Sequence, residues 1–111
     1  MDSSGWFGVR CIFRVAAATG VHAYEERVTV WQAAGPDSAI GLAETEAHAY
    51  AQAIDAEYLE LAQVYAMADR LGDGAEVFSL IRDSALDAPE YLIAFFDTGS
   101  EHQTSGDPKI T

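Results

Sequence analysis

Cysteine is nearly absent from this sequence, and basic residues are scarce. Cys11 is the only cysteine among 111 residues, so a disulfide bond within the chain is excluded. Six Lys and Arg residues stand against eighteen Asp and Glu, which gives a formal net charge of −12. A surface of this sign repels phosphate backbones and anionic lipids, so we expect neither a nucleic-acid partner nor a membrane partner. A basic protein partner is expected instead, because opposite charge speeds association.

Long apolar runs and targeting signals are missing as well. The chain contains no stretch of about 18 apolar residues that would span a bilayer. Residues 1–5 carry no basic residue and no long apolar stretch, unlike a secretory signal peptide. The turn Gly72-Asp73-Gly74 lacks the lysine and the following helix of a phosphate-binding loop. These observations predict a cytoplasmic protein without a cofactor.

The residues that are present suffice for one core. Half of them are apolar and twelve are aromatic, and 111 residues are too few for two good cores. We therefore predict a single domain over residues 6–97. An N-terminal extension would precede it at residues 1–5, and a polar tail would follow at residues 98–111.

Two strands open the predicted domain. In residues 6–15, apolar side chains alternate with a second set that includes two arginines, which is the period of a strand buried on one side. The alternation resumes in residues 24–33, with Val28 and Val30 on one face and Arg27, Thr29 and Trp31 on the other. Joined by a longer loop, the two strands are expected to form an antiparallel hairpin.

A helix is expected to follow at residues 37–54. Pro36, Asp37 and Ser38 are typical of a helix start. Apolar residues then recur at spacings of three and four, which predicts a buried stripe; its members are Ile40, Ala43, Ala47, Tyr50, Ala51 and Ile54.

The second half of the chain is less clear. Residues 58–71 fit either a longer helix or a strand that starts near Leu61, and we favour the strand because one helix of about 35 residues is improbable in so small a domain. A fourth strand at residues 76–82 and a short helix opened by Pro89 complete the pattern. The predicted fold is α+β, ββαββα: a four-stranded, mainly antiparallel sheet with one long helix on a face and a short C-terminal helix.

Few residue patterns indicate chemistry. Glu44 and His48 lie one helical turn apart, but no third ligand accompanies them, so no metal site is predicted and an exposed helix face is the simpler interpretation. Cys11 alternates with large apolar residues, which favours burial over a role as nucleophile. We therefore predict no catalytic residues and expect that the protein is not an enzyme.

Two surfaces are candidates for binding. Trp6, Arg10 and Arg14 share one face of the first strand, and Trp31 of the second strand is a candidate to join them. These arginines would bind an acidic partner or pair with carboxylates of the chain itself. The other candidate is the acidic surface that begins with the helix, represented by Glu44, Glu46 and Glu57.

Several segments resemble a family of small bacterial proteins classed as a domain of unknown function. The similar segments are Trp6-Phe7-Gly8-Val9-Arg10, Tyr24-Glu25-Glu26-Arg27-Val28, Gly74-Ala75-Glu76-Val77-Phe78-Ser79 and Glu90-Tyr91-Leu92. The resemblance covers residues 6–96. It supports the predicted fold and implies no activity.

The sequence favours a non-catalytic protein-binding module, of the inhibitor or immunity type, over other functions. Small size, a charge of one sign and the lack of a catalytic constellation all fit that role. The alternative is a small biosynthetic enzyme or ligand-binding protein with a pocket between sheet and helix, using Arg10, His48, Tyr50 or Tyr65. A homodimer across the free sheet face or along a sheet edge is a further expectation.

Overall fold

The structure is a computed structural model that describes residues 4–16 and 20–103. Its contacts divide the chain into two compact units, Met1–Leu80 and Ile81–Thr111, and each unit is considered by itself. The predicted N-terminal extension and the predicted tail therefore lie largely outside the described residues, as does part of the loop between the first two strands.

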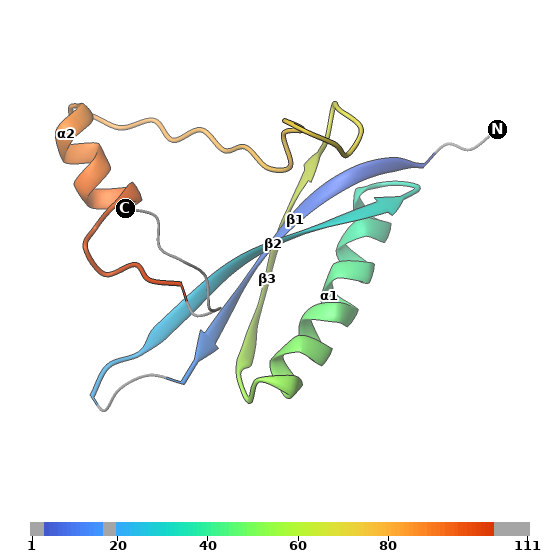
Figure 1. The fold of residues 1–111 in the computed structure, drawn as a ribbon, viewed down its shortest axis with the longest axis horizontal. Coiled ribbons are helices and arrows are strands. Elements are labelled where there is room, and N and C mark those ends of the chain that lie inside the picture. The colour runs from blue at the N-terminus through green and yellow to red at the C-terminus, as the bar shows by residue number, and fades with distance from the viewer. Residues whose placement is uncertain (1–3, 17–19, 104–111) are drawn as a thin grey trace. The chain divides into compact units, whose positions relative to one another are not determined.

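A three-stranded antiparallel sheet forms the centre of the first unit (Figure 1). Strand β1 (Gly5–Val15) lies between β2 (Ala23–Ala33) and β3 (Glu57–Ala66). β1 and β2 pair without interruption along their whole length, from Gly5 opposite Ala33 to Val15 opposite Ala23. The predicted hairpin is thus confirmed, and β1 buries the alternate residues that its period-2 pattern predicts.

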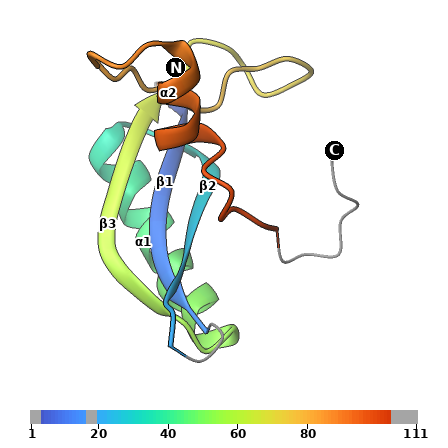
Figure 2. The ribbon, with the colours of Figure 1, turned by 90° about the vertical axis from the view of Figure 1, so that its left-hand side faces the viewer.

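Helix α1 (Pro36–Ala53) lies along one face of this sheet (Figure 2). The helix is confirmed, and so is the burial of Ala43, Ala47 and Ala51 in its predicted stripe, but Ala39 takes the buried place predicted for Ile40. The fully buried positions are four alanines, Ala39, Ala43, Ala47 and Ala51. Ile40 is only half-buried and Ile54 is exposed, because the small alanine side chains bring the helix backbone close to the sheet and turn the larger residues to its flanks.

Sheet side chains fill most of the volume of the core. Val9 and Phe13 of β1 are completely buried beneath the alanine stripe of α1. Tyr50 of α1 packs edge-on against Phe13, with ring centroids 5.2 Å apart, and Tyr58 of β3 packs beside the same ring at 5.4 Å. Cys11 lies in the same layer and is 4% exposed. Its burial, which the sequence predicts, raises the pKa of the thiol because the thiolate would be poorly solvated.

One polar network fixes α1 to β2. Arg27 donates two hydrogen bonds to the carboxylate of Glu46, at 2.7 and 2.9 Å, and its guanidinium carbon lies 3.6 Å from the centre of the Tyr50 ring. The Tyr50 hydroxyl in turn donates to Glu25 at 2.7 Å. The Arg27 hydrogen bonds hold the pKa of Glu46 below its usual value.

Strand β3 begins at Glu57, four residues earlier than predicted, and it is irregular. Its pairing with β1 shifts between Cys11 and Phe13, so that three residues of β3 stand where β1 has only Ile12. Glu60 lies within this bulge at φ 61°, a left-handed conformation that is uncommon for a residue other than glycine. The bulge explains why simple alternation failed to place the start of this strand.

The predicted fourth strand is not confirmed. The chain makes a turn at Gly72, where the Ala75 amide donates to the Gly72 carbonyl, and then continues without a ladder partner. Val77 instead crosses β1 at Gly8, so closely that a methyl group at Gly8 would overlap the Val77 carbonyl oxygen. The strand-like alternation of residues 76–82 is therefore not accompanied by pairing with the sheet.

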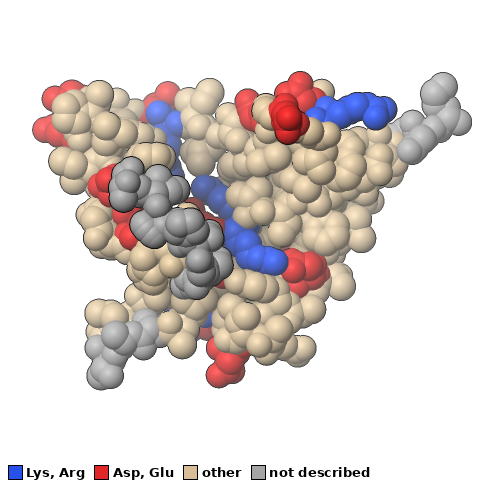
Figure 3. All heavy atoms as spheres, in the orientation of Figure 1, with Lys and Arg blue, Asp and Glu red and all other residues tan. Residues whose placement is uncertain are grey.

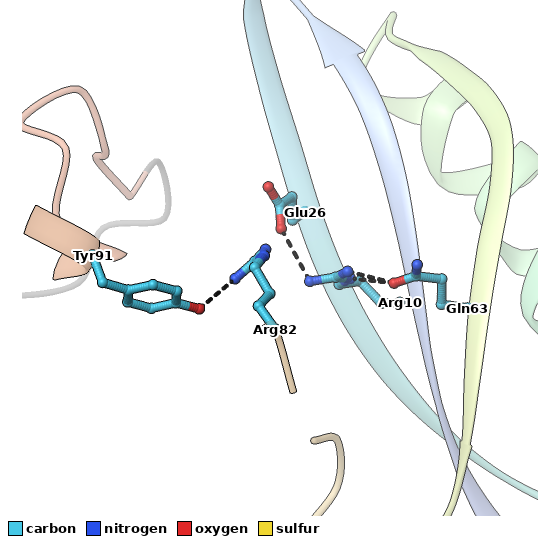
Figure 4. Close-up of polar contacts among 5 residues, drawn as sticks. All are labelled: Arg10, Glu26, Gln63, Arg82 and Tyr91. Carbon is cyan, nitrogen blue, oxygen red and sulfur yellow. Dashed lines mark hydrogen bonds and ion pairs between the residues drawn. The ribbon is translucent and has the colours of Figure 1, made fainter. Parts of the chain in front are cut away.

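The second unit contains a short helix, as predicted. α2 (Ala88–Tyr91) continues into a π-helical turn, η1 (Leu92–Phe96). Asp87 caps the Glu90 amide, and the Glu90 side chain accepts from the Asp87 amide, which forms a capping box. Arg82 donates to the Tyr91 hydroxyl at 3.1 Å (Figure 4). None of the helices in the described part of the chain has the length and apolar character needed to cross a membrane.

Candidate binding face of the sheet

The sheet face opposite α1 carries most of the candidate residues, and we call it the arginine face. β1 contributes Trp6, Gly8, Arg10, Ile12 and Arg14 to it, and their direct partners in the sheet register complete it. Those partners are Tyr24, Glu26, Val28, Val30 and Gln32 of β2, and Glu57, Gln63 and Tyr65 of β3. The face exists because alternate residues of a strand point to opposite sides of the sheet.

Arg10 lies at the centre of this face (Figure 4). Its guanidinium donates to the Gln63 side-chain oxygen, with Nε at 3.1 Å, and pairs with Glu26 at 3.5 Å. The Phe78 ring lies 5.1 Å from the guanidinium carbon, within the range of a cation–π contact. The Arg10 side chain is therefore only 17% exposed, with its charge neutralised inside the chain.

Arg14 is also paired within the chain. It donates to Glu57 at 2.5 Å, and this hydrogen bond raises the pKa of the guanidinium. The interpretation that Arg10 and Arg14 pair with carboxylates of the chain itself is therefore confirmed. Space-filling Figure 3 shows basic and acidic side chains interspersed with uncharged surface.

Exposed apolar side chains flank these ion pairs. Tyr24 is 56% exposed and Val28 is 41% exposed, both on β2. Leu61, which lies within the bulge of β3, is 50% exposed. The alternation of β2 indicates from the sequence that Tyr24 and Val28 share a face, whereas the bulge in β3 interrupts the alternation at Leu61.

Trp31 does not join the arginine face. It stands opposite Phe7 in the β1–β2 register, which places it on the face that α1 covers, packed against the core. Its indole nitrogen donates to the Thr29 hydroxyl at 2.7 Å. The sequence pattern already separates Trp31 from Val28 and Val30, so its grouping with Trp6 conflicts with that alternation.

The three representative acids of the helix surface all have partners inside the chain. Glu46 binds Arg27, Glu57 binds Arg14, and Glu44 accepts a 2.7 Å hydrogen bond from the Tyr58 hydroxyl. Burial and the Glu44 hydrogen bond together raise the pKa of Tyr58. These glutamates therefore hold elements of the fold together. Other acids of the chain make no hydrogen bond or ion pair of this kind; they include Asp37, Asp55, Asp69 and Asp73.

Glu44 and His48 do not pair with each other, although they lie one turn apart. His48 pairs instead with Glu60 of the β3 bulge, at 3.3 Å, and its ring stands edge-on to Tyr58. Both side chains of this ion pair are more than half exposed. Among residues 4–16 and 20–103, no three His, Cys, Asp or Glu side chains are grouped so that they could hold a metal ion.

The polar groups of the alternative pocket lie on two different sides of the sheet. Arg10 and Tyr65 belong to the arginine face, and Tyr65 donates to Glu76 at 2.5 Å. His48 and Tyr50 belong to α1 on the opposite side and are bonded to Glu60 and Glu25. These four groups do not converge on one cavity.

Comparison of the chain with protein-family models, with curated proteins and with solved structures finds no match.

Proposed function

We propose that this chain is a non-catalytic protein-binding module, of the inhibitor or immunity type, and that it binds its partner through the arginine face. The observation that carries the proposal is the exposure of Tyr24 and Val28 on a strand whose other face is covered by α1. Tyrosine and arginine are enriched among the residues that contribute most to protein interfaces, and the buried centre of an interface is more apolar than the rest of the surface.

The chemistry of the face suggests how a partner would bind. The paired arginines leave the centre nearly neutral, so contact energy would come mainly from burying the apolar rim. The net charge of −12 acts at longer range, where it would steer a basic protein toward the molecule. Affinity would then depend on Val28 and its neighbours, and the association rate would depend on salt.

A matched pair of variants tests the contact surface. Val28→Ser removes an apolar side chain from the arginine face, and Leu42→Ser removes one from the outer side of α1, where Leu42 is 45% exposed. A partner captured with the unaltered protein as bait should be lost with Val28→Ser and retained with Leu42→Ser. Loss with neither variant, or equal loss with both, would contradict the proposal. A small molecule that copurifies in place of a protein would favour the ligand-binding alternative.

The charge contribution needs variants that leave the fold intact. Reversal of Glu44, Glu46 and Glu57 would break the internal contacts described above, so it cannot isolate long-range attraction. Asp37→Asn, Asp55→Asn and Asp69→Asn remove three charges that make no such contacts. The triple variant should bind the captured partner more slowly, and the difference from the unaltered protein should shrink at high salt. An unchanged on-rate would show that the partner is not steered by acidic charge.

A further inference from the structure

Strand β2 presents a long and regular outer edge. It pairs with β1 on one side only, along all eleven residues from Ala23 to Ala33, and its register contains no bulge. It contains neither proline nor glycine. The other edge strand, β3, is interrupted by its bulge and by the left-handed Glu60, features that normally prevent a further strand from pairing.

The second half of β2 is also uncharged. Its sequence from residue 28 is Val-Thr-Val-Trp-Gln-Ala, rich in residues that favour strands. A straight, uncharged edge with free amide and carbonyl groups readily accepts another strand. The features that proteins use to prevent such pairing are therefore present on β3 and absent from this part of β2.

We propose that a second copy of the chain occupies this edge, and that two β2 strands pair antiparallel about a twofold axis at Thr29. This inference does not depend on the proposed function, because the two copies would join through main-chain hydrogen bonds at the edge of the sheet, whichever molecule binds the side chains of the arginine face. The result would be a continuous six-stranded sheet with α1 of both copies on the same side.

The charges of β2 restrict the axis to the second half of the strand. An axis at Glu25, Glu26 or Arg27 would place two like charges directly opposite each other, which destabilises a strand pair. An axis at Val28, Thr29 or Val30 places every charged residue of β2 opposite an uncharged one, and we choose Thr29 among these three for the side-chain pairs that it forms.

The individual pairs in this register are also favourable. Thr29 meets its own counterpart, and Val28 meets Val30, pairs of kinds that stabilise antiparallel strands. Glu26 meets Gln32, whose amide can donate a hydrogen bond to the carboxylate. Because β2 can pair with itself in this register without bringing like charges together, a second copy of the chain is a suitable occupant of the edge.

Disulfide trapping tests the register directly. Directly opposed residues of an antiparallel pair have Cα atoms about 4.5–5.5 Å apart, which suits a disulfide bond. The full chain carrying Thr29→Cys should therefore form a reducible dimer of twice 11.9 kDa under mild oxidation, while native Cys11 stays buried. Gln32→Cys alone should not, because its counterpart lies six residues away along the strand, roughly 20 Å.

A mixture adds a second check of the same register. Glu26→Cys and Gln32→Cys chains should form a mixed disulfide with each other, because these two positions face across the axis. Dimers of Gln32→Cys alone, or no mixed disulfide in the mixture, would overturn the proposed register.

Charge variants at Gln32 test the interface without altering the fold, since this side chain is exposed. In sedimentation experiments, Gln32→Lys should tighten the dimer several-fold by facing Glu26, and Gln32→Glu should weaken it several-fold. Gln52→Lys and Gln52→Glu on the outer side of α1 change the net charge equally and serve as controls. Equal effects at both positions would overturn the proposal, and so would a protein that stays monomeric at all salt concentrations.

Salt separates this proposal from the proposed function. Two copies with a net charge of −12 repel each other, so the unaltered protein should dimerise more tightly as salt rises. Association with a basic partner should become slower under the same conditions. If the dimer does not respond to salt in this way, the salt dependence of partner binding still tests the proposed function, and the reverse also holds.

Discussion

Gly8→Ala provides a strong test of the packing on the arginine face. Gly8 is buried in the central strand, and the backbone of Val77 passes directly over it. A methyl group at this position would overlap the Val77 carbonyl oxygen, and a backbone atom cannot move aside as the end of a flexible side chain can. The segment that contains Val77 and Phe78 would have to lift from the sheet.

The cost follows from what that movement exposes. Val77 and Phe78 are both half-buried, and full burial of such side chains contributes about 1.5–3 kcal/mol each, so their partial loss amounts to about 2 kcal/mol. Alanine is favoured over glycine in a strand by about 0.5–1 kcal/mol, which offsets part of this. We expect Gly8→Ala to lower the free energy of unfolding by about 1–1.5 kcal/mol, or roughly 4–12 °C in melting temperature.

Gly5→Ala is the matched control. A Cβ at Gly5 would lie 3.9 Å from the Phe7 ring, an ordinary contact distance, so this variant should be neutral or slightly stabilising. Urea unfolding followed by tryptophan fluorescence compares the two, and limited proteolysis reports whether the segment at Val77 becomes accessible. If Gly8→Ala proved as stable and as resistant as Gly5→Ala, the segment would not cross β1 at this point.

Three further predictions concern the opposite side of the sheet. Tyr50→Ala should lower the free energy of unfolding in urea by about 2 kcal/mol, which is less than the loss expected for a fully buried ring. Tyr50→Phe should lower it by about 1 kcal/mol, because the hydrogen bond to Glu25 is lost. A loss under 0.5 kcal/mol for Tyr50→Ala would place the ring in solvent. Cys11 should react with a thiol reagent only upon unfolding, because burial raises its pKa, and immediate labelling of the folded protein would refute this. The pKa of Glu46 is lowered from 4.5 in the folded protein. The contribution of this carboxylate to stability is therefore fully present above pH 4.5 and is lost as the pH falls through the native pKa. Glu46→Gln should make acid unfolding less steep, and an unchanged pH profile would argue against the Arg27 pair.

The sequence predicts those elements whose signals are local. β1 and β2 alternate without interruption, so the hairpin, its faces and the burial of Cys11 follow from the pattern. Helix α1 follows from its start signal at Pro36 and its alanine content. The predicted stripe is correct at Ala43, Ala47 and Ala51 and wrong at Ile40 and Ile54, because the short distance between helix and sheet favours alanine over the larger isoleucine.

Features that depend on distant segments could not be predicted in this way. The partners of Arg10, Glu44 and His48 lie on elements far away in the sequence, and no spacing within one helix or strand indicates them. The bulge that displaces β3 leaves no turn residue as a signal, since Glu60 adopts its left-handed conformation without being glycine. The alternation in residues 76–82 is real, but a strand also needs a free edge at the right place.

The four buried alanines of α1 make this helix sensitive to larger side chains, whereas most buried helix positions are sensitive to smaller ones. In most amphipathic helices the buried side is recognised by its large apolar residues, and truncation there is what damages the protein. Here the buried side tolerates little that is larger than a methyl group, because Val9 and Phe13 already occupy the space. Variation over evolutionary time should therefore preserve smallness on the inner side of α1 and bulk on β1.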